Sequence, residues 1–440
     1  MKRAIVPVLG AVISLSLGRP TAALPYPQGS FEKYINSNSR FGTKLFKSLY
    51  AADPDKNIIF SPLGISSLFA CLREGTRGEI RNELDKAFEW APDQELGPPH
   101  RRLTARFIFP SFPSPEEERR REAKKRLDED VFTDNSKIRD AIEGFYLPRE
   151  DSTGREELWL KNSLQFHGLE ASKAFSERFL EKAQNDYGLK FDEVKDAKEW
   201  NAAISRFPGV RPMLDLGASE QYFFILNSVV NLKTEWRRDT FAPNHPISGE
   251  FLTVQGSRVP VRMLVSLPGI FPYAKTENYE AVVLPAENAD FVVVMPKEGI
   301  SLMALAEAFA EDPDFLVPRL ERRPGDVQLP EVNFAGKEYL RSHLESLGAK
   351  TIFNDLGDLV RIPESRLLAV EQVISFEVDL MGIHTKAITS TIGVYGGVLG
   401  TDEGFHMKIN RPFLFQIRDN VTGVLLFMGA VTDPSRHSLA

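Results

Sequence analysis

The stretch NIIFSPLGISSLFACLREGTRGEIRNELDKAF, residues 57–88, predicts two consecutive helices. Ser61 followed by Pro62 is a good helix start, because the hydroxyl can accept an unpaired backbone N–H and proline fits the first helical position. The residues that follow keep helical spacing and include several small side chains, so this helix can pack closely against a neighbour. Thr76 and Glu79 form a capping-box pattern for the second helix. The stretch therefore predicts a pair of helices that belongs to a packed core.

Strand-like and helix-like segments are interleaved irregularly along the rest of the chain. The run QYFFILNSVVNL at 221–232 is almost continuously β-branched and aromatic, which is typical of a strand buried on both faces. Further strands are predicted at 158–164, 279–284 and 290–295, and further helices at 172–187, 301–309 and 339–347. Long helices between irregularly spaced strands favour an α+β fold around large sheets over a doubly wound fold.

The segment at 91–156 differs in character from its surroundings. Prolines crowd into 98–115, and the run EEERRREAKKR at 116–126 alternates blocks of acidic and basic residues. We interpret the segment as a charged, Pro-rich insertion, either a solvated helix or partly disordered, which the fold can do without. A helix that binds a polyanion is the alternative, although the three leading glutamates weaken its basic field.

The N-terminal sequence MKRAIVPVLGAVISLSLGRPTAA has the three-part layout of a secretory signal peptide. Two basic residues precede an apolar run, and Thr21 and Ala23 suit a cleavage site. The apolar run is shorter than the roughly 20 residues that span a bilayer, so a membrane anchor is less favoured. We expect residues 1–23 to be a signal peptide and residues 24–440 to form one secreted domain that does not enter a membrane.

Composition and motifs point away from an enzyme. The formal charge is -7, whereas binding to nucleic acid requires Lys and Arg to neutralise phosphates. None of the seven histidines lies four residues from another, and the sequence holds neither a G-x-S-x-G elbow nor a phosphate-binding loop ending in Gly-Lys-Ser/Thr. We therefore expect no catalytic residue, no metal site and no cofactor. Cys71, the single cysteine, is expected to be buried by packing, and Asn420 begins the one N-glycosylation sequon.

Four segments resemble, in the correct order, motifs of the serpin family of serine protease inhibitors. NIIFSPLGISSLF at 57–69 resembles the helix that begins with an Asn-x-x-x-Ser-Pro signature, and LNSVVNLKTEWRRDTF at 226–241 resembles a central strand that ends in a tryptophan, here Trp236. LPEVNFAGKEYLRSHLESLGAKTIFN at 329–354 is similar to the strand and helix before the family's mobile loop. INRPFLFQIRDNVTGVLLFMGAVTDP at 409–434 resembles the C-terminal hairpin. The resemblance covers most of the chain outside the insertion.

This resemblance implies a fold of three β-sheets and eight or nine helices with an exposed reactive-centre loop, held in a metastable state. In the family, a target protease cleaves the loop and becomes covalently attached to it. The loop then inserts as a new strand into the largest sheet and distorts the protease. The implied protein is a secreted monomer that is not an enzyme, and its implied partner is a serine or cysteine protease.

The resemblance places the loop at about 382–404, GIHTKAITSTIGVYGGVLGTDEG. Inhibitory members usually place Thr or Ser after the hinge glycine and alanines further on, whereas this chain has Ile383. Strand side chains alternate between two faces, so an inward Ile383 carries a small and β-branched set inward with it, namely Thr385, Ala387, Thr389 and Thr391. His384, Lys386 and Ser390 would then face water. Insertion is expected to be slowed by the bulk of Ile383, because overpacking costs roughly 1–3 kcal/mol.

The scissile bond is expected to follow an apolar or aromatic residue. Counting from the hinge glycine by analogy with the family leads to a short stretch of candidates, namely Tyr395, Gly396, Gly397, Val398 and Leu399. No Lys or Arg lies between Lys386 and Lys408, which favours chymotrypsin-like or elastase-like proteases over trypsin-like ones.

The resemblance also implies a sheet-opening region beneath the strands that must part, formed by Ser61, Gly64, Asn227, Ser228, Trp236 and Gln372. Several of these depart from the family pattern. Gly64 replaces a second serine, and the usual histidine before the loop is replaced by Gln372 or its neighbour Glu371. The usual asparagine of the central strand is Asn227, or Ser228 if the spacing to the tryptophan is kept. We expect Ser61, Asn227 and Gln372 to form a substitute hydrogen-bond network.

Two functions from different classes therefore remain open. Protease inhibition is the usual activity of the family. The alternative is a non-inhibitory serpin that acts as a carrier, storage or interaction protein, because the hinge and the sheet-opening residues are altered.

Overall fold

The computed structural model describes residues 29–108, 157–167, 175–193, 223–237, 240–241, 246–360, 367–384 and 404–436. Within these ranges the chain forms seven α-helices: α1 (Ser30–Ala52), α2 (Pro62–Gly75), α3 (Gly78–Ala87), α4 (Gly97–Ile108), α8 (Glu177–Tyr187), α10 (Leu302–Glu311) and α11 (Arg341–Leu347). Three short 3₁₀ turns accompany them: η2 (Val317–Arg319), η3 (Thr351–Phe353) and η4 (Gly357–Leu359). The expected eight or nine helices refer to the whole chain, so the described ranges do not test that number.

The helix start at Ser61 and Pro62 is confirmed. Ser61 Oγ accepts a hydrogen bond from the Gly64 backbone N–H at 3.1 Å, and α2 begins at Pro62. The prediction of a capping box formed by Thr76 and Glu79 is wrong. Thr76 closes α2 instead, since its hydroxyl donates to the Arg73 carbonyl at 3.2 Å, and α3 begins after Arg77 without a side-chain cap.

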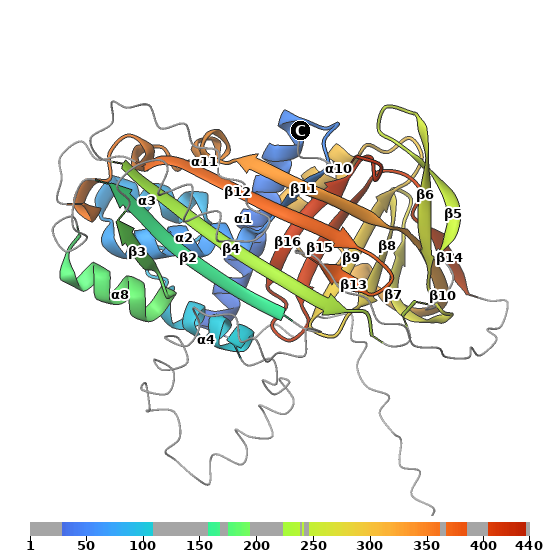
Figure 1. Cartoon of the computed structure of the whole chain (residues 1–440), viewed down its shortest axis with the longest axis horizontal. Helices are drawn as coiled ribbons and strands as arrows, with labels where there is room; N and C mark the ends of the chain where they lie inside the picture. The colour runs from blue at the N-terminus through green and yellow to red at the C-terminus, as the bar shows by residue number, and fades with distance from the viewer. Residues whose placement is uncertain are drawn as a thin grey trace, which may run out of the picture.

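The described strands form a six-stranded and a ten-stranded sheet. The smaller sheet has the order β11 (Val332–Tyr339), β12 (Leu367–Val378), β13 (Gly382–His384), β4 (Phe223–Glu235), β2 (Glu157–His167) and β3 (Lys190–Glu193). The larger sheet has the order β1 (Ile58–Phe60), β16 (Leu425–Val431), β15 (Phe413–Asp419), β9 (Ala289–Pro296), β8 (Tyr279–Pro285), β7 (Gly269–Lys275), β10 (Glu321–Pro330), β6 (Arg258–Val265) and β5 (Ile247–Leu252), with β14 (Phe405–Lys408) paired to β10. Figure 1 shows the smaller sheet crossing in front of α1 and α2.

The α+β expectation is confirmed, while the three expected sheets are joined into two hydrogen-bonded networks in the described ranges. The connection lies in β10, which pairs with β7 through residues 321–325 and with β6 through residues 328–330. One long strand therefore joins the strands on its two sides into a single hydrogen-bonded sheet.

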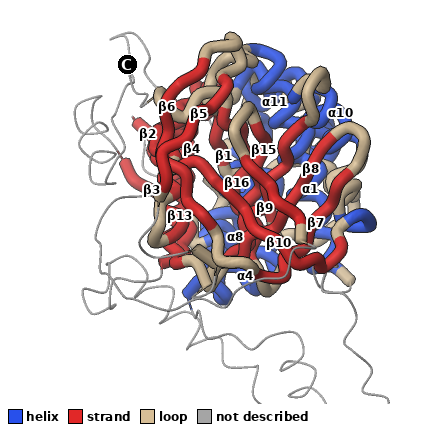
Figure 2. Tube along the Cα trace, turned by 90° about the vertical axis from the view of Figure 1, so that its right-hand side faces the viewer, coloured by secondary structure: helices blue, strands red, loops and turns tan. Residues whose placement is uncertain are grey.

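An aromatic cluster joins the two sheets. Phe376 of β12 stacks on Phe415 of β15 with ring centroids 4.7 Å apart, and Phe291 of β9 lies 5.6 Å from Phe415. All three rings are buried, and β15 and β16 are buried along their whole length in the middle of the molecule (Figure 2). Each such side chain contributes roughly 1.5–3 kcal/mol through burial, so the C-terminal hairpin forms the centre of the core.

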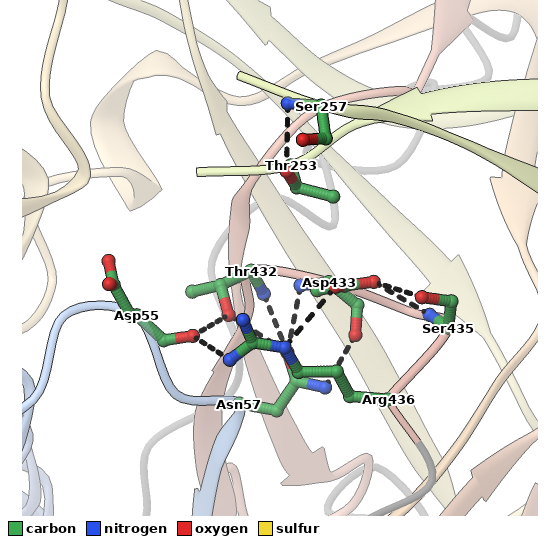
Figure 3. A network of polar contacts seen from close by, with 8 residues as sticks. All are labelled: Asp55, Asn57, Thr253, Ser257, Thr432, Asp433, Ser435 and Arg436. Atoms are coloured by element: carbon green, nitrogen blue, oxygen red, sulfur yellow. Dashed lines mark hydrogen bonds and ion pairs between the residues drawn. The ribbon is translucent and has the colours of Figure 1, made fainter. Parts of the chain in front are cut away.

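Asn57, the first residue of the stretch that predicted the fold, fastens the C-terminal segment (Figure 3). Its Oδ1 accepts the backbone N–H groups of Thr432 and Asp433 at 2.8 and 3.0 Å, and its Nδ2 donates to the Asp433 carbonyl at 2.7 Å. The Thr432 hydroxyl and Arg436 both donate to the Asp55 carbonyl, at 2.9 and 3.1 Å. The chain before β1 and the chain after β16 are thereby held side by side.

The predicted start of the charged, Pro-rich insertion at residue 91 is wrong, because residues 91–108 belong to the folded body. Leu96, Leu103 and His100 of this stretch are buried. His100 Nδ1 lies 2.9 Å from the Asp186 carbonyl, which requires a proton on Nδ1, so Nε2 accepts the hydroxyl of Ser67 in α2. Burial lowers the pKa of His100 to about 4, which keeps the ring neutral. Sequence reasoning missed this contact because α4 buries a narrow face between prolines and charges.

We predict different outcomes for two replacements of this region by a short Gly/Ser linker. Replacing residues 109–156 should preserve a single cooperative unfolding transition. Replacing residues 91–156 should abolish that transition or lower the free energy of unfolding severely, because it removes Leu96, Leu103 and His100, and each buried leucine contributes roughly 1.5–3 kcal/mol. Denaturant unfolding followed by circular dichroism decides this. Equal stability of the two variants would contradict the structural assignment of α4.

Candidate functional site at the loop hinge

The short strand β13 occupies a gap between β12 and β4. At one end of the sheet β12 and β4 pair directly in parallel, with Leu367 opposite Phe224 and Val370 opposite Leu226. At the other end β13 pairs antiparallel with both neighbours, so that Ile383 stands between Val378 and Thr234. The two long strands have therefore parted over part of their length, and the start of the predicted loop fills the opening.

A tight turn at residues 379–382 reverses the chain from β12 into β13. Asp379 Oδ1 accepts the backbone N–H groups of Met381 and Gly382 at 2.7 and 3.1 Å, and the Asp379 N–H donates to the Gly382 carbonyl at 3.1 Å. Asp is favoured in turns because its side chain bonds the backbone two residues further on. Sequence reasoning did not single out Asp379, although an Asp three residues before a Gly is the signal that could have identified this turn.

Trp236, at the end of β4, holds this turn in place. Its indole Nε1–H donates to the Asp379 carbonyl at 2.8 Å, and its backbone N–H donates to the Met381 carbonyl at 3.1 Å. The ring is buried against Phe241 and Phe291, with centroids 5.0 and 6.1 Å away. The tryptophan noticed in the sequence therefore contacts the hinge through both its main chain and its side chain.

Gly382 and Ile383 fit the opening in different ways. The backbone of Gly382 lies so close to β4 that a Cβ atom at this position would overlap the Thr234 carbonyl oxygen and lie 2.9 Å from Glu235 Cα. The Ile383 side chain is completely buried, with 0% of it exposed, which is the inward orientation that the alternation argument took as its condition. The remaining hinge residues after His384 and all the scissile-bond candidates lie outside the described residues, as does the side chain of His384.

Two of the three residues expected in the network beneath the sheet, Gln372 and Ser61, contact each other directly. Gln372 Oε1 accepts the Ser61 backbone N–H at 2.6 Å, and Gln372 Nε2 donates to the Ser61 carbonyl at 3.4 Å. The Ser61 hydroxyl donates to the Leu426 carbonyl at 2.7 Å. Gln372 is buried at this contact, while the side chain of Glu371 lies outside the described residues. Gly64 is buried in the first turn of α2.

The central-strand candidates are placed by register alone. Asn227 lies opposite Ser163 of β2, and Ser228 lies opposite Asn162, just beyond the point where β4 stops pairing with β12. Their side chains lie outside the described part of the structure, so their share in the network stays a prediction.

Carboxylates surround the hinge turn. Glu331, between β10 and β11, forms an ion pair with Arg262 of β6 at 3.3 Å. Burial raises the pKa of the Glu331 carboxyl, Arg262 opposes this rise, and the charges of Asp379 and Glu377 add to it. Asp379, Glu377 and Glu331 therefore lie close enough for their negative charges to repel one another, and Arg262 offsets part of that repulsion.

Cys71 and Asn420, two further residues noted in the sequence, both lie within the described ranges. Cys71 is buried in α2, and burial raises the pKa of its thiol, which suits a packing role. Among the described residues, no cluster of three or more His, Cys, Asp or Glu side chains could hold a metal ion. Among the same residues, no helix is long and apolar enough to cross a membrane. Asn420 lies in the turn between β15 and β16.

The sequence model of one protein family, described as "Serpin (serine protease inhibitor)", matches residues 36–434. The chain belongs to the serpin family. Among its relatives are Serpin A3-7 of Bos taurus, 27% identical over 418 residues that cover 91% of this chain and 88% of the relative, and the alpha-1-antiproteinase of Rattus norvegicus, 25% identical over 428 residues that cover 92% and 90%.

Solved serpin structures share the fold. Human kallistatin superposes with a TM-score of 0.69 at 16% identity and covers 93% of this chain and 100% of its own. Thyroxine-binding globulin in complex with thyroxine superposes with a TM-score of 0.66 at 18% identity and covers 92% and 100%. At these identities the likeness establishes the fold alone.

We predict that Gly382→Ala expels β13 from the sheet without unfolding the serpin. The added methyl group overlaps the Thr234 carbonyl, so the Gly382–His384 pairing cannot form at this register. Amide hydrogen exchange of a peptide covering residues 380–384 should accelerate at least tenfold.

Gly404→Ala is the matched control at the far end of the loop. Its Cβ would lie 3.1 Å from the nearest atom, the Pro324 carbonyl oxygen, whereas the Cβ at Gly382 would lie 2.0 Å from the Thr234 carbonyl oxygen. Unchanged hinge exchange in the Gly382 variant would show that the close approach does not hold β13 in place.

Proposed function

We propose that this serpin is a secreted inhibitor of serine endopeptidases that traps its target by loop cleavage and strand insertion. One observation carries the proposal: β13 already lies between β12 and β4, and the side chain of its central residue, Ile383, is buried. A loop that has begun as a strand of the sheet needs only to lengthen that strand once a protease cuts it. The partner of this activity is a protease, as for the family.

The alternation set by Ile383 supports further insertion. If the strand continues beyond His384, the next inward positions are Thr385, Ala387, Thr389 and Thr391, none of which is charged. Burying these residues leaves no unpaired charge in the sheet, and the backbone gains a ladder of hydrogen bonds on both sides. Ile383 is bulky, yet it is accommodated in the uncleaved sheet, so its packing cost is already met before cleavage.

The composition of the loop supports a chymotrypsin-like or elastase-like target. Tyr395, Val398 and Leu399 suit apolar specificity pockets, and no Lys or Arg for a trypsin-like pocket lies between Lys386 and Lys408. We place the scissile bond after one of these three residues, with Gly396 and Gly397 providing backbone freedom between them.

A non-inhibitory role is the second candidate, and two observations favour it. The described network beneath the sheet joins Gln372 to Ser61 through two hydrogen bonds that must break or slide when the strands part further. One structural neighbour, thyroxine-binding globulin, is seen in complex with thyroxine. A serpin whose sheet resists opening would be cut without trapping the protease and would act as a carrier, storage or interaction protein.

We predict that the native protein forms a covalent complex with chymotrypsin or pancreatic elastase that survives denaturing electrophoresis. Thr389→Arg should convert the serpin into a substrate that is cut without complex formation, because it places an unpaired charge on the inward face. Ser390→Arg is the matched control, since residue 390 faces outward in the same alternation and the complex should persist.

Mass spectrometry of the released fragment should place the cut after Tyr395, Val398 or Leu399. Cleavage of the native loop in this stretch without any stable complex would contradict inhibition and favour the non-inhibitory role.

Secretion supplies a separate prediction. The signal-like residues 1–23 should be absent from protein collected outside the producing cells, which should begin near Leu24. N-terminal sequencing measures this directly. Soluble protein in the cytosol that retains Met1 would contradict secretion, whatever the outcome of the trapping experiment.

A further inference from the structure

The sequon residue Asn420 contacts a turn that belongs to another part of the ten-stranded sheet. Its Nδ2 donates to the carbonyl of Glu287 at 2.7 Å and to that of Ala286 at 3.4 Å. Its backbone N–H donates to the Asn288 carbonyl at 3.3 Å. The turn between β15 and β16 is therefore fastened to the turn between β8 and β9 at three successive carbonyls.

The Asn420 turn is itself held in one conformation. The buried carboxylate of Asp419 accepts the backbone N–H and the hydroxyl of Thr422, both at 2.7 Å. The Gly423 N–H donates to the Asp419 carbonyl at 2.8 Å, and Gly423 has a φ of 75°, which glycine adopts at little cost. The amide of Asn420 is thus presented to its partners in a fixed position.

The β8–β9 turn is also hydrogen-bonded to the end of β4. The Glu287 N–H donates to the Glu235 carbonyl at 3.0 Å, and the Asn288 N–H donates to the buried Thr234 hydroxyl at 3.1 Å. Arg237 contacts the same turn twice, with its backbone N–H to the Pro285 carbonyl and its Nε to the Ala286 carbonyl, both at 3.2 Å. These contacts fix the last residues of β4 to a different sheet.

The end of β4 pairs directly with the residues of the hinge. Thr234 and Glu235 pair with Ile383 and Gly382, and Trp236 donates to the carbonyls of Asp379 and Met381. A continuous series of hydrogen bonds therefore leads from Asn420 through the β8–β9 turn and the end of β4 to the turn that begins the loop.

We propose that Asn420 is a positioning residue for the loop hinge, acting through the β8–β9 turn to hold the end of β4 in register with β13. The inference concerns the uncleaved protein, and its consequence for strand insertion rests on the proposed function. The Asn420 side chain must act as a hydrogen-bond donor here, because both groups that it contacts are backbone carbonyls.

The same geometry bears on the sequon. A glycan bonded to Nδ2 replaces one of its two hydrogens, so the two carbonyl contacts of that atom cannot both be kept. Glycosylation of Asn420 and the full pair of side-chain contacts therefore exclude each other.

The test is amide hydrogen exchange of the uncleaved, full-length protein carrying Asn420→Asp. A carboxylate cannot donate to the Ala286 and Glu287 carbonyls and is repelled by them, so peptides covering residues 233–237 and 380–384 should exchange at least tenfold faster. Peptides within β16 should keep their protection, which a general loss of stability would not allow. Asn420→Ala, which adds no charge, provides a second variant if the Asp variant fails to fold.

Asn354→Asp is the matched control. Asn354 also donates from Nδ2 to a backbone carbonyl, that of Lys350 at 3.3 Å, but it directly follows the 3₁₀ turn η3, after α11. Hinge exchange equal to that of the native protein in both Asn420 variants would overturn the proposal. Because no protease is used, this result is independent of whether the native serpin traps its target.

Discussion

The partial separation of β4 from β12 is the constraint on which the rest of the structure depends. These strands pair directly near residues 224–226 and 367–370, yet they admit β13 between them at the other end. A sheet cannot stay parted unless the exposed backbone groups find partners, since an unpaired buried N–H or carbonyl costs free energy comparable to a lost hydrogen bond. The first residues of the loop provide those partners, and this arrangement determines which residues near the gap tolerate change.

Two sets of contacts hold the parted strands from opposite sides. Beneath the sheet, Gln372 fixes β12 to the start of α2, whose Ser61 is bonded to the central hairpin through Leu426. At the top, Trp236 and the β8–β9 turn fix the end of β4 and the hinge turn together. If more of the loop inserts, β12 and β4 must separate further. The Gln372–Ser61 hydrogen bonds resist that separation, while the contacts of Trp236 with the hinge turn can stay in place.

The elements with strong periodicity could be predicted from sequence, while contacts between distant segments could not. The helix start at Ser61 and the strands at 158–164, 279–284 and 290–295 follow local rules. The burial of Ile383 came from the structure, because alternation tells only which residues share its face. The packing of α4 was missed because His100 finds its partners, Ser67 and the Asp186 carbonyl, in two other helices. Asn420 was recognised as part of a sequon, but its contacts with Ala286 and Glu287 depend on the meeting of two turns more than 130 residues apart.

The central claim is that the hinge is the beginning of an inserted strand, and the unfolding temperature before and after a single cut in the loop tests it most directly. A loop that completes its insertion adds a central strand with hydrogen bonds on both sides and buries Thr385, Ala387, Thr389 and Thr391. The account predicts that the cleaved protein unfolds tens of degrees above the intact one, far beyond the roughly 2–4 °C that 1 kcal/mol produces in a mid-sized domain. An unchanged unfolding temperature after cleavage would contradict it and would mean that β13 is a fixed strand with no capacity to grow.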